Sequence, residues 1–109
     1  MSDKKLPKLN WRKLGGLIPA VTQDFKTGKV LMVGFMNKTA LTKTLKEKQV
    51  TYFSRTRKKL WTKGETSGNF QIVKDILQDC DSDTLLIRAK QIGNVCHTGH
   101  TSCFYQKIL

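Results

Sequence analysis

The sequence contains 109 residues, of which 20 are Lys or Arg and 8 are Asp or Glu, so its formal net charge is +12 at pH 7. This length predicts a single small domain, and a hydrophobic fraction of 39% predicts a globular chain rather than a disordered one. Residues 1–13 contain no apolar core and no apolar run has the length of a membrane span, which argues against a secretory signal and a transmembrane protein. A cytoplasmic, reducing environment is expected, because three cysteines cannot all pair within one chain.

The positive charge has two explanations that charge alone does not separate. Lysines spread singly over solvated faces would keep the protein soluble, whereas clustered basic residues would attract an anionic partner. That partner would be nucleic acid or a phosphorylated metabolite. The composition therefore leaves open both a binding module and an enzyme with a phosphorylated substrate.

The chain order predicts a basic, flexible N-terminal arm at residues 1–13 and a single domain at residues 14–109. Pro19 favours a sheet edge or a bulge in the first strand, and Thr27-Gly28 predicts a hairpin turn into the second. Apolar alternation and β-branched residues predict strands at residues 16–24, 29–35, 50–54, 60–62, 70–77 and 84–90.

One helix of about three turns is predicted to begin at Lys38, with Asn37 as its N-cap. Ala40, Leu41, Thr44 and Leu45 then fall on one side of this helix, which is the side expected to be buried. The predicted fold class is α+β, predominantly antiparallel β with one main helix.

All three cysteines and both histidines lie in the segment 79–103. Three thiolates with an open fourth position are typical of a catalytic zinc site, while the spacing of Cys80, Cys96 and Cys103 excludes a common zinc finger. The alternative is that cysteines are small buried apolar residues, which for Cys80 considered alone is the better interpretation. Whether the ligands come from one chain or two is open at this point.

Asp79, Asp81 and Asp83 form a second cluster beside Cys80. Carboxylates favour magnesium, calcium or manganese, and three of them so close together repel one another unless a cation lies among them. In a regular strand the outer two would be about 13 Å apart, so joint chelation requires a bend in the chain or bridging phosphates and waters. The alternative is a solvated turn; an EF-hand is rejected because its required Gly and Glu are absent.

Four motifs, in the right order, together resemble the phosphoribosyl-AMP cyclohydrolase family of histidine biosynthesis, a family of hydrolases. The resemblance covers nearly everything from residue 16 to residue 104, and its motifs are GLIPAVTQD, SRTRKKLWTKGETSGN, DCDSD and GNVCHTGHTSCF. It implies an intertwined homodimer with one zinc per subunit at the interface. It assigns zinc to Cys80 of one subunit and to Cys96 and Cys103 of the other, and magnesium to Asp79, Asp81 and Asp83. Relatives with a fused pyrophosphohydrolase domain exist, and no such domain is expected here.

The resemblance also implies the reaction. A zinc-activated water would open the adenine ring of 1-(5-phosphoribosyl)-AMP at the N1–C6 bond, giving the phosphoribosyl-formimino-aminoimidazole carboxamide ribotide. His97, adjacent to Cys96, is the candidate catalytic group for proton transfer or the fourth zinc position; His100 is a weaker one. The predicted substrate-binding residues supply cationic, hydroxyl and backbone N–H groups for two phosphates, and they are Arg55, Arg57, Lys63, Glu65, Thr66 and Ser67.

A non-enzymatic, zinc-stabilised nucleic-acid-binding module is the alternative function. Basic residues and the aromatic side chains of Tyr52, Phe53 and Trp61 would serve as its binding surface. The aspartate cluster argues against it, because carboxylates repel phosphates unless a metal lies between them. Nucleic acid and membrane are therefore not expected as partners.

Overall fold

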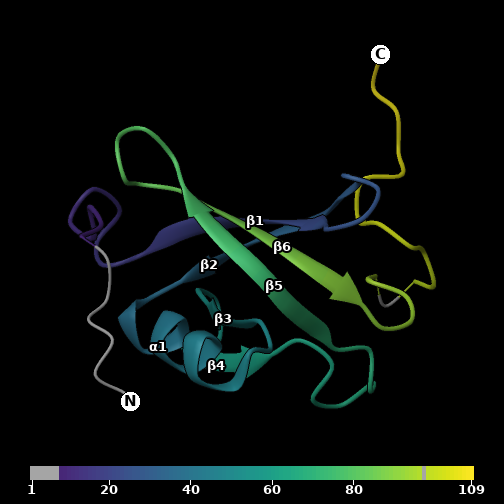
Figure 1. The fold of residues 1–109 in the computed structure, drawn as a ribbon, viewed down its shortest axis with the longest axis horizontal. Helices are drawn as coiled ribbons and strands as arrows, with labels where there is room; N and C mark the ends of the chain where they lie inside the picture. The colour runs from purple at the N-terminus through teal and green to yellow at the C-terminus, as the bar shows by residue number, and fades with distance from the viewer. Residues whose placement is uncertain (1–7, 97) are drawn as a thin grey trace.

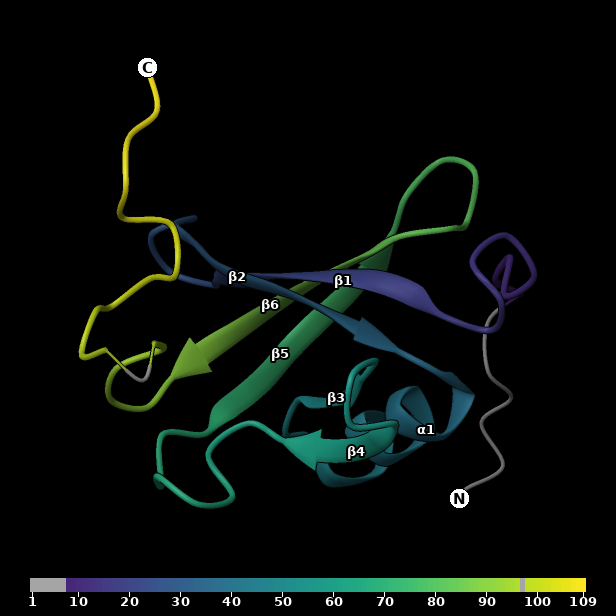
Figure 2. The same cartoon turned by 180° about the vertical axis from the view of Figure 1, so that it is seen from behind.

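The structure is a computed structural model that describes residues 8–96 and 98–109. In chain order its elements are β1 (Ile18–Asp24), β2 (Val30–Met36), α1 (Lys38–Glu47), β3 (Thr51–Ser54), β4 (Lys59–Thr62), β5 (Gln71–Gln78) and β6 (Leu85–Gln91). Four strands form one sheet in the order β2-β1-β6-β5, and β3 pairs with β4 in a separate hairpin. Figures 1 and 2 show α1 and the β3–β4 hairpin together on one side of the four-stranded sheet. Within the described residues no helix is long and apolar enough to cross a membrane.

The α+β class and the single main helix are confirmed, and three of the four strand pairings are antiparallel. The fourth pairing, β1 with β6, is parallel, so the main sheet is mixed. The two strands run in the same direction because α1 and the β3–β4 hairpin intervene before the chain returns to the sheet. The homodimer stays a prediction.

The expected edge position of the first strand is wrong, because β1 pairs with β2 on one side and with β6 on the other. Pro19 is tolerated there since the β1–β6 pairing begins one residue later, at Ala20, so the missing proline N–H interrupts no bond to β6. The expected bulge is found further along, where the β1–β2 register shifts between Thr22 and Gln23.

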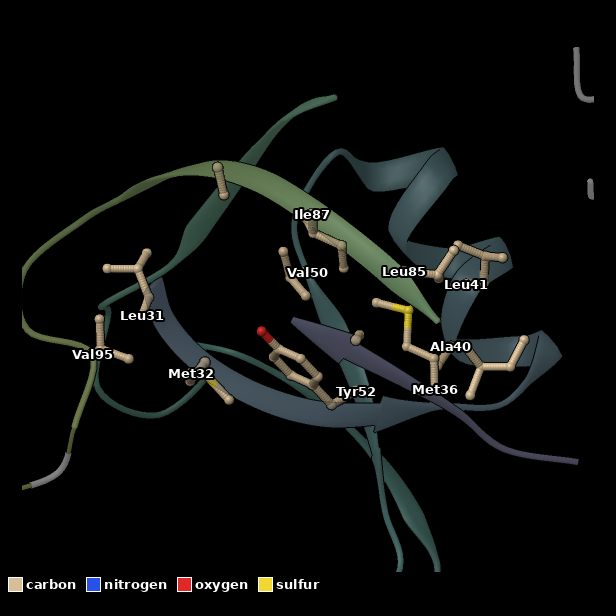
Figure 3. Packing of buried hydrophobic residues seen from close by; sticks show 13 residues of the cluster. Leu31, Met32, Met36, Ala40, Leu41, Val50, Tyr52, Leu85, Ile87 and Val95 are labelled. Atoms are coloured by element: carbon tan, nitrogen blue, oxygen red, sulfur yellow. The ribbon is translucent and has the colours of Figure 1, made fainter. Parts of the chain in front are cut away.

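The core lies between the sheet and the layer formed by α1 and β3 (Figure 3). Asn37 caps α1 as predicted, with its side-chain oxygen accepting from the Ala40 N–H at 2.8 Å. Tyr52 is fully buried; its hydroxyl lies 2.6 Å from Thr22 Oγ1 and donates to Gln71 Oε1 at 2.7 Å. Gly34 is required beneath this ring, because a Cβ there would lie 2.5 Å from Tyr52 Cδ1. The contact between Gly34 and Tyr52 thus packs β2 closely against β3.

Candidate functional site

The loop between β5 and β6 brings the three aspartates together. One oxygen from each of Asp79, Asp81 and Asp83 lies within 4.8 Å of the others, and this is the only such group of His, Cys, Asp or Glu in the described residues. The chain here is a turn, not a strand, with Ser82 in the left-handed region at φ 59°. The bend that joint chelation requires is therefore present. We call residues 79–84 the aspartate turn.

Hydrogen bonds hold the aspartate turn in shape. Asp79 Oδ1 accepts from the N–H groups of Asp83 at 3.0 Å and Thr84 at 3.1 Å. The Asp79 backbone N–H donates to the Thr84 carbonyl oxygen, and the Ser82 N–H donates to the Asp79 carbonyl oxygen. These bonds are local, because each of them spans no more than five residues.

Lys13 places an ammonium group among the carboxylates. Its Nζ pairs with Asp83 and lies 3.5 Å from Asp81, while the Asn10 N–H donates to the Ser82 carbonyl oxygen at 2.7 Å. The Lys13 hydrogen bond holds the pKa of Asp83 well below its usual range. The pKa of Asp81 is raised, by hydrogen bonds with Asp83 and Asp79 and then by burial. Repulsion among the carboxylates is thus partly relieved by a cation of the chain itself.

The cysteine loop, residues 95–103, lies at the other end of β6. Val95 anchors its start, with a side chain only 1% exposed, and Ser102 anchors its end by donating to the Val30 carbonyl oxygen at 2.8 Å. The Cys103 N–H donates to the Leu31 carbonyl oxygen at 2.8 Å. Within the loop, the Cys96 N–H donates to the His100 carbonyl oxygen at 3.1 Å.

Cys96 and Cys103 face each other closely enough that each thiol affects the pKa of the other. Hydrogen bonds from Thr98, whose hydroxyl lies 3.0 Å from the Cys96 sulfur, lower the pKa of Cys96. Burial, followed by the charge of Cys96, raises the pKa of Cys103. All three cysteines are free thiols.

Cys80 does not join this pair within one chain. It lies in the aspartate turn, and β6 separates it from the cysteine loop by about 20 Å of strand, at roughly 3.3 Å per residue. Figures 1 and 2 place the β5–β6 loop and the C-terminal segment at opposite ends of the sheet. The three predicted zinc ligands are therefore divided between two places in the fold.

Of the two histidines, His97 lies outside the described residues. His100 is exposed and stacks on Tyr105, with 3.6 Å between the ring centroids. The stacking gives His100 a packing partner in the C-terminal segment.

The β3–β4 hairpin and the loop after β4 form a pocket of about 520 Å³. Five of the six predicted substrate residues line it, namely Arg57, Lys63, Glu65, Thr66 and Ser67. Lys59 of the same basic cluster also lines it, as do Ser54, Trp61 and Thr62, which the sequence did not indicate as substrate contacts. The sequence indicated Trp61 only as part of an alternative nucleic-acid-binding surface. Its position between Lys59 and Lys63 was the feature that could have predicted a place in this pocket.

Of the six predicted substrate residues, Arg55 is the one that does not line this pocket. Arg55 lies over the Phe35 ring, with its guanidinium carbon 4.2 Å from the centroid. Glu65 Oε1 accepts from the Thr62 N–H at 2.8 Å, so this side chain ties the loop after β4 to the end of that strand. Lys63 donates to the Val95 carbonyl oxygen, which joins the pocket to the cysteine loop.

Gly64 allows the loop after β4 to close. Its φ is 92°, and a Cβ there would lie 2.5 Å from the Phe70 backbone nitrogen. Only glycine meets both conditions without strain. The Gly68 N–H completes the loop by donating to the Gly64 carbonyl oxygen at 2.7 Å.

Comparisons with known proteins agree on one family. The family model described as phosphoribosyl-AMP cyclohydrolase matches residues 32–105. The chain is 49% identical over 105 residues to the phosphoribosyl-AMP cyclohydrolase of Clostridium beijerinckii, covering 96% of each protein. It is 57% identical over 106 residues to that of Chloroherpeton thalassium, covering 97% of this chain and 76% of the relative.

A second group of relatives is longer. The chain is 55% identical over 101 residues to the histidine biosynthesis bifunctional protein HisIE of Haemophilus influenzae, covering 93% of this chain and 46% of that protein. It therefore spans about half the length of the bifunctional relatives that it matches.

Proposed function

Since the chain belongs to the phosphoribosyl-AMP cyclohydrolase family, we propose that it hydrolyses 1-(5-phosphoribosyl)-AMP in histidine biosynthesis. Water adds to C6 of the adenine ring, the C6–N1 bond breaks, and N1 takes a proton. The water oxygen becomes the carboxamide oxygen of the phosphoribosyl-formimino-aminoimidazole carboxamide ribotide. Ribosylation of N1 makes the ring amidinium-like, so C6 is the electrophilic carbon.

The observation that carries this proposal is the position of the pocket beside the cysteine pair. The pocket has the size of ligand sites, which range from roughly 300 to 1,000 Å³. It is lined by Arg57 and by Thr66 and Ser67, whose hydroxyls can bind a phosphate oxygen. Lys63, which also lines it, donates to the carbonyl oxygen of Val95, the residue before Cys96. A phosphorylated nucleotide bound here would therefore have its base within reach of the thiols.

The donor chemistry of the cysteines fits zinc. Cys96 and Cys103 are free thiols held on one anchored loop, and hydrogen bonding to Thr98 favours the thiolate of Cys96. Thiolate sulfurs are the ligands that select zinc over magnesium or calcium. A zinc ion held by Cys80, Cys96 and Cys103 would supply the Lewis acidity that makes water nucleophilic near neutral pH.

Because Cys80 lies far from the other two, the zinc site proposed here needs a second copy of the chain. The homodimer would bring Cys80 of one subunit to Cys96 and Cys103 of the other. This arrangement also explains why Cys80 is exposed and lies in a turn, although cysteine is usually among the more buried residues.

An apolar row on the open face of the sheet supports the dimer. Val21 is paired with Val33 on one side and with Leu86 on the other, and Leu86 is paired with Leu77. Paired residues point to the same face, and because the strand neighbours Ala20, Leu85 and Ile87 belong to the core, this row points away from the core. Val33 is 46% exposed and Leu77 is 47% exposed. A second subunit over this row would bury it.

The aspartate turn fits magnesium, since its donors are oxygens that converge within 4.8 Å. Asp81 and Asp79 are exposed, so an ion held there could also meet a substrate phosphate or ordered water. A magnesium ion would supply positive charge at that position. One carboxylate oxygen of Asp79 accepts hydrogen bonds from backbone N–H groups, which leaves its other oxygen for the ion.

Proton transfer is assigned to His97, next to Cys96. A histidine is the side chain whose ordinary pKa best suits taking a proton from water and giving one to N1 near neutral pH. His97→Gln should lower kcat by about 10²–10⁴-fold while the zinc content stays that of the wild type. A variant that loses zinc together with activity would instead make His97 a ligand.

The decisive experiment is an ultraviolet assay of ring opening with purified protein and phosphoribosyl-AMP. Turnover should be abolished by a zinc chelator and restored by added zinc, and Cys103→Ala should lose both zinc and activity. AMP, which lacks the N1 ribosyl group, serves as the control substrate and should not react. Full turnover by zinc-free Cys103→Ala protein would refute the zinc site, and no turnover in any metal would refute the activity.

A further inference from the structure

Lys63 bridges two parts of the site that are distant in sequence. Its backbone N–H donates to the Val50 carbonyl oxygen at 3.0 Å, which fixes the residue just after β4. Its ammonium donates to the Val95 carbonyl oxygen, 32 positions further along the chain. Val95 precedes Cys96, so this single side chain links the pocket loop to the first thiol of the cysteine loop.

The side chain of Lys63 is partly shielded from solvent by its neighbours. The side chain is half-buried, and its Nζ lies 5.9 Å from the centroid of the Trp61 ring. A charge in such a place is screened less by water than the charge of an exposed lysine. It therefore acts more strongly on nearby groups of opposite charge.

The ammonium group of Lys63 lies at the peptide group that joins Val95 to Cys96, because its acceptor is the Val95 carbonyl oxygen. Cys103 lies at the other end of the same loop, next to Ser102, which is anchored on the Val30 carbonyl oxygen. A positive charge at this position would be favoured beside cysteines that bind a metal as thiolates.

The phosphate-binding role that the sequence suggested for Lys63 uses the same ammonium group, which is turned to Val95 instead. Arg57 and Lys59 line the same pocket and are exposed, so they remain free to meet an incoming phosphate. The pocket therefore offers two exposed cations besides Lys63 for the phosphates.

We propose that Lys63 is a positioning residue of the thiolate site. It holds the Val95–Cys96 segment in place through the Val95 carbonyl and offsets the negative charge that builds up when the cysteines bind a metal as thiolates. The inference rests on the zinc site of the proposed function and adds to it a residue that touches no ligand atom. Groups that support metal ligands in this way typically change metal affinity by about 10–100-fold when removed.

The test is a titration of the metal-free, full-length protein with Co²⁺, followed by the absorption of the cobalt–thiolate bond. Lys63→Met, which keeps the length of the side chain but removes its charge and its donor, should weaken Co²⁺ binding about tenfold. Lys63→Arg, which keeps both, should retain most of the affinity. Wild-type affinity in folded Lys63→Met protein overturns the proposal.

Lys29→Met is the matched control. Lys29 also donates to the cysteine loop, at Thr101 Oγ1 over 3.1 Å, but that contact is exposed. Its removal should leave Co²⁺ affinity unchanged, and an equal loss in both variants would overturn the proposal in favour of a general charge effect. If Lys63→Met does not fold, Lys63→Gln replaces it under the same criterion. Failure of the wild-type protein to bind Co²⁺ would refute the zinc site itself, and the inference with it.

Discussion

The aspartate turn and the cysteine loop lie at opposite ends of β6 and are built in opposite ways. The aspartate turn gathers its three carboxylates from five consecutive residues, with oxygens within 4.8 Å of one another. The cysteine loop gathers only Cys96 and Cys103, and the third cysteine belongs to the aspartate turn. The aspartate cluster is complete within a chain, while the proposed zinc site would be divided between two.

This difference shows what each kind of cluster requires. Many of the hydrogen bonds that order the aspartates lie inside the turn, between residues at most five positions apart, and Lys13 and Asn10 add contacts from the N-terminal segment. The cysteine loop instead depends on anchors from distant elements, namely Val30, Leu31 and Lys63. A divided site also couples metal binding to subunit assembly, whereas the aspartate turn is predicted to bind its cation with or without a partner.

The sharpest test of this division is complementation between two inactive variants. Cys80→Ala and Cys103→Ala should each lose nearly all turnover when purified alone. If Cys80 serves the neighbouring subunit, half of the dimers in a remixed equimolar sample are mixed, and each has one intact site of two. Activity after co-refolding should therefore recover to about a quarter of the wild-type value.

The control for complementation is a mixture of Cys96→Ala with Cys103→Ala. These two residues are on the same loop, so every site in a mixed dimer contains at least one substitution and no activity should return. Recovery in this control, or none with Cys80→Ala, would contradict the division of ligands between subunits.

The second prediction separates the two metals. Asp81→Asn removes one carboxylate charge from the aspartate turn and should weaken Mg²⁺ binding about tenfold, because affinity for hard cations follows the number of charged ligands. Isothermal titration calorimetry measures this, and zinc content by metal analysis should not change. Asp75→Asn, outside both sites, is the control. Unaltered Mg²⁺ affinity in Asp81→Asn would remove the aspartates from that role.

A smaller effect is expected at the anchor of the cysteine loop. Ser102→Ala removes the hydrogen bond to the Val30 carbonyl oxygen and should lower the free energy of unfolding by about 1 kcal/mol. Denaturant unfolding measures this loss. Amide hydrogen exchange should increase around Cys103 and stay unchanged in the aspartate turn. Equal increases at both ends of β6 would contradict the independence of the two regions.

The smallest expected effect concerns Lys13, whose ammonium lies where a metal cation would compete with it. Lys13→Met should raise Mg²⁺ affinity about threefold, a modest change because exposed ion pairs contribute little. Arg12→Met removes an equal charge from the adjacent residue and should leave the affinity closer to that of the wild type. Equal affinity for Mg²⁺ in all three proteins would show that Lys13 does not compete.

Much of the fold could be predicted from local patterns. Asn37 and the apolar side formed by Ala40, Leu41 and Thr44 predicted α1, and Thr27-Gly28 predicted the β1–β2 hairpin. Pro19 led to the wrong prediction that β1 is an edge strand. Proline disfavours a central strand only where its missing N–H would have a partner. Whether that partner exists depends on β6, which lies far along the chain. The parallel β1–β6 contact was missed for the same reason.

In the candidate site, too, local features were predicted and contacts between distant segments were not. Arg57, Lys63, Glu65, Thr66 and Ser67 were predicted to act together and do line one pocket, since they are neighbours in a single hairpin and loop. Arg55 belongs to the same segment but lies on Phe35, and the ammonium group of Lys63 also donates to Val95. Where a long side chain ends depends on partners that sequence spacing does not reveal.

By itself, the sequence determined the family, the strands and helix, and the identity of the thiol and carboxylate groups, because these follow from residue type and near-neighbour spacing. Only the tertiary structure decided that the aspartates converge, that Cys80 lies apart from Cys96 and Cys103, and that Lys63 donates to Val95. The physical reason is the extended geometry of β6: a strand joins two segments in sequence but holds them apart in space. Proximity in the chain therefore predicted one cluster correctly and left the other to be completed by a second copy of the chain, as we propose.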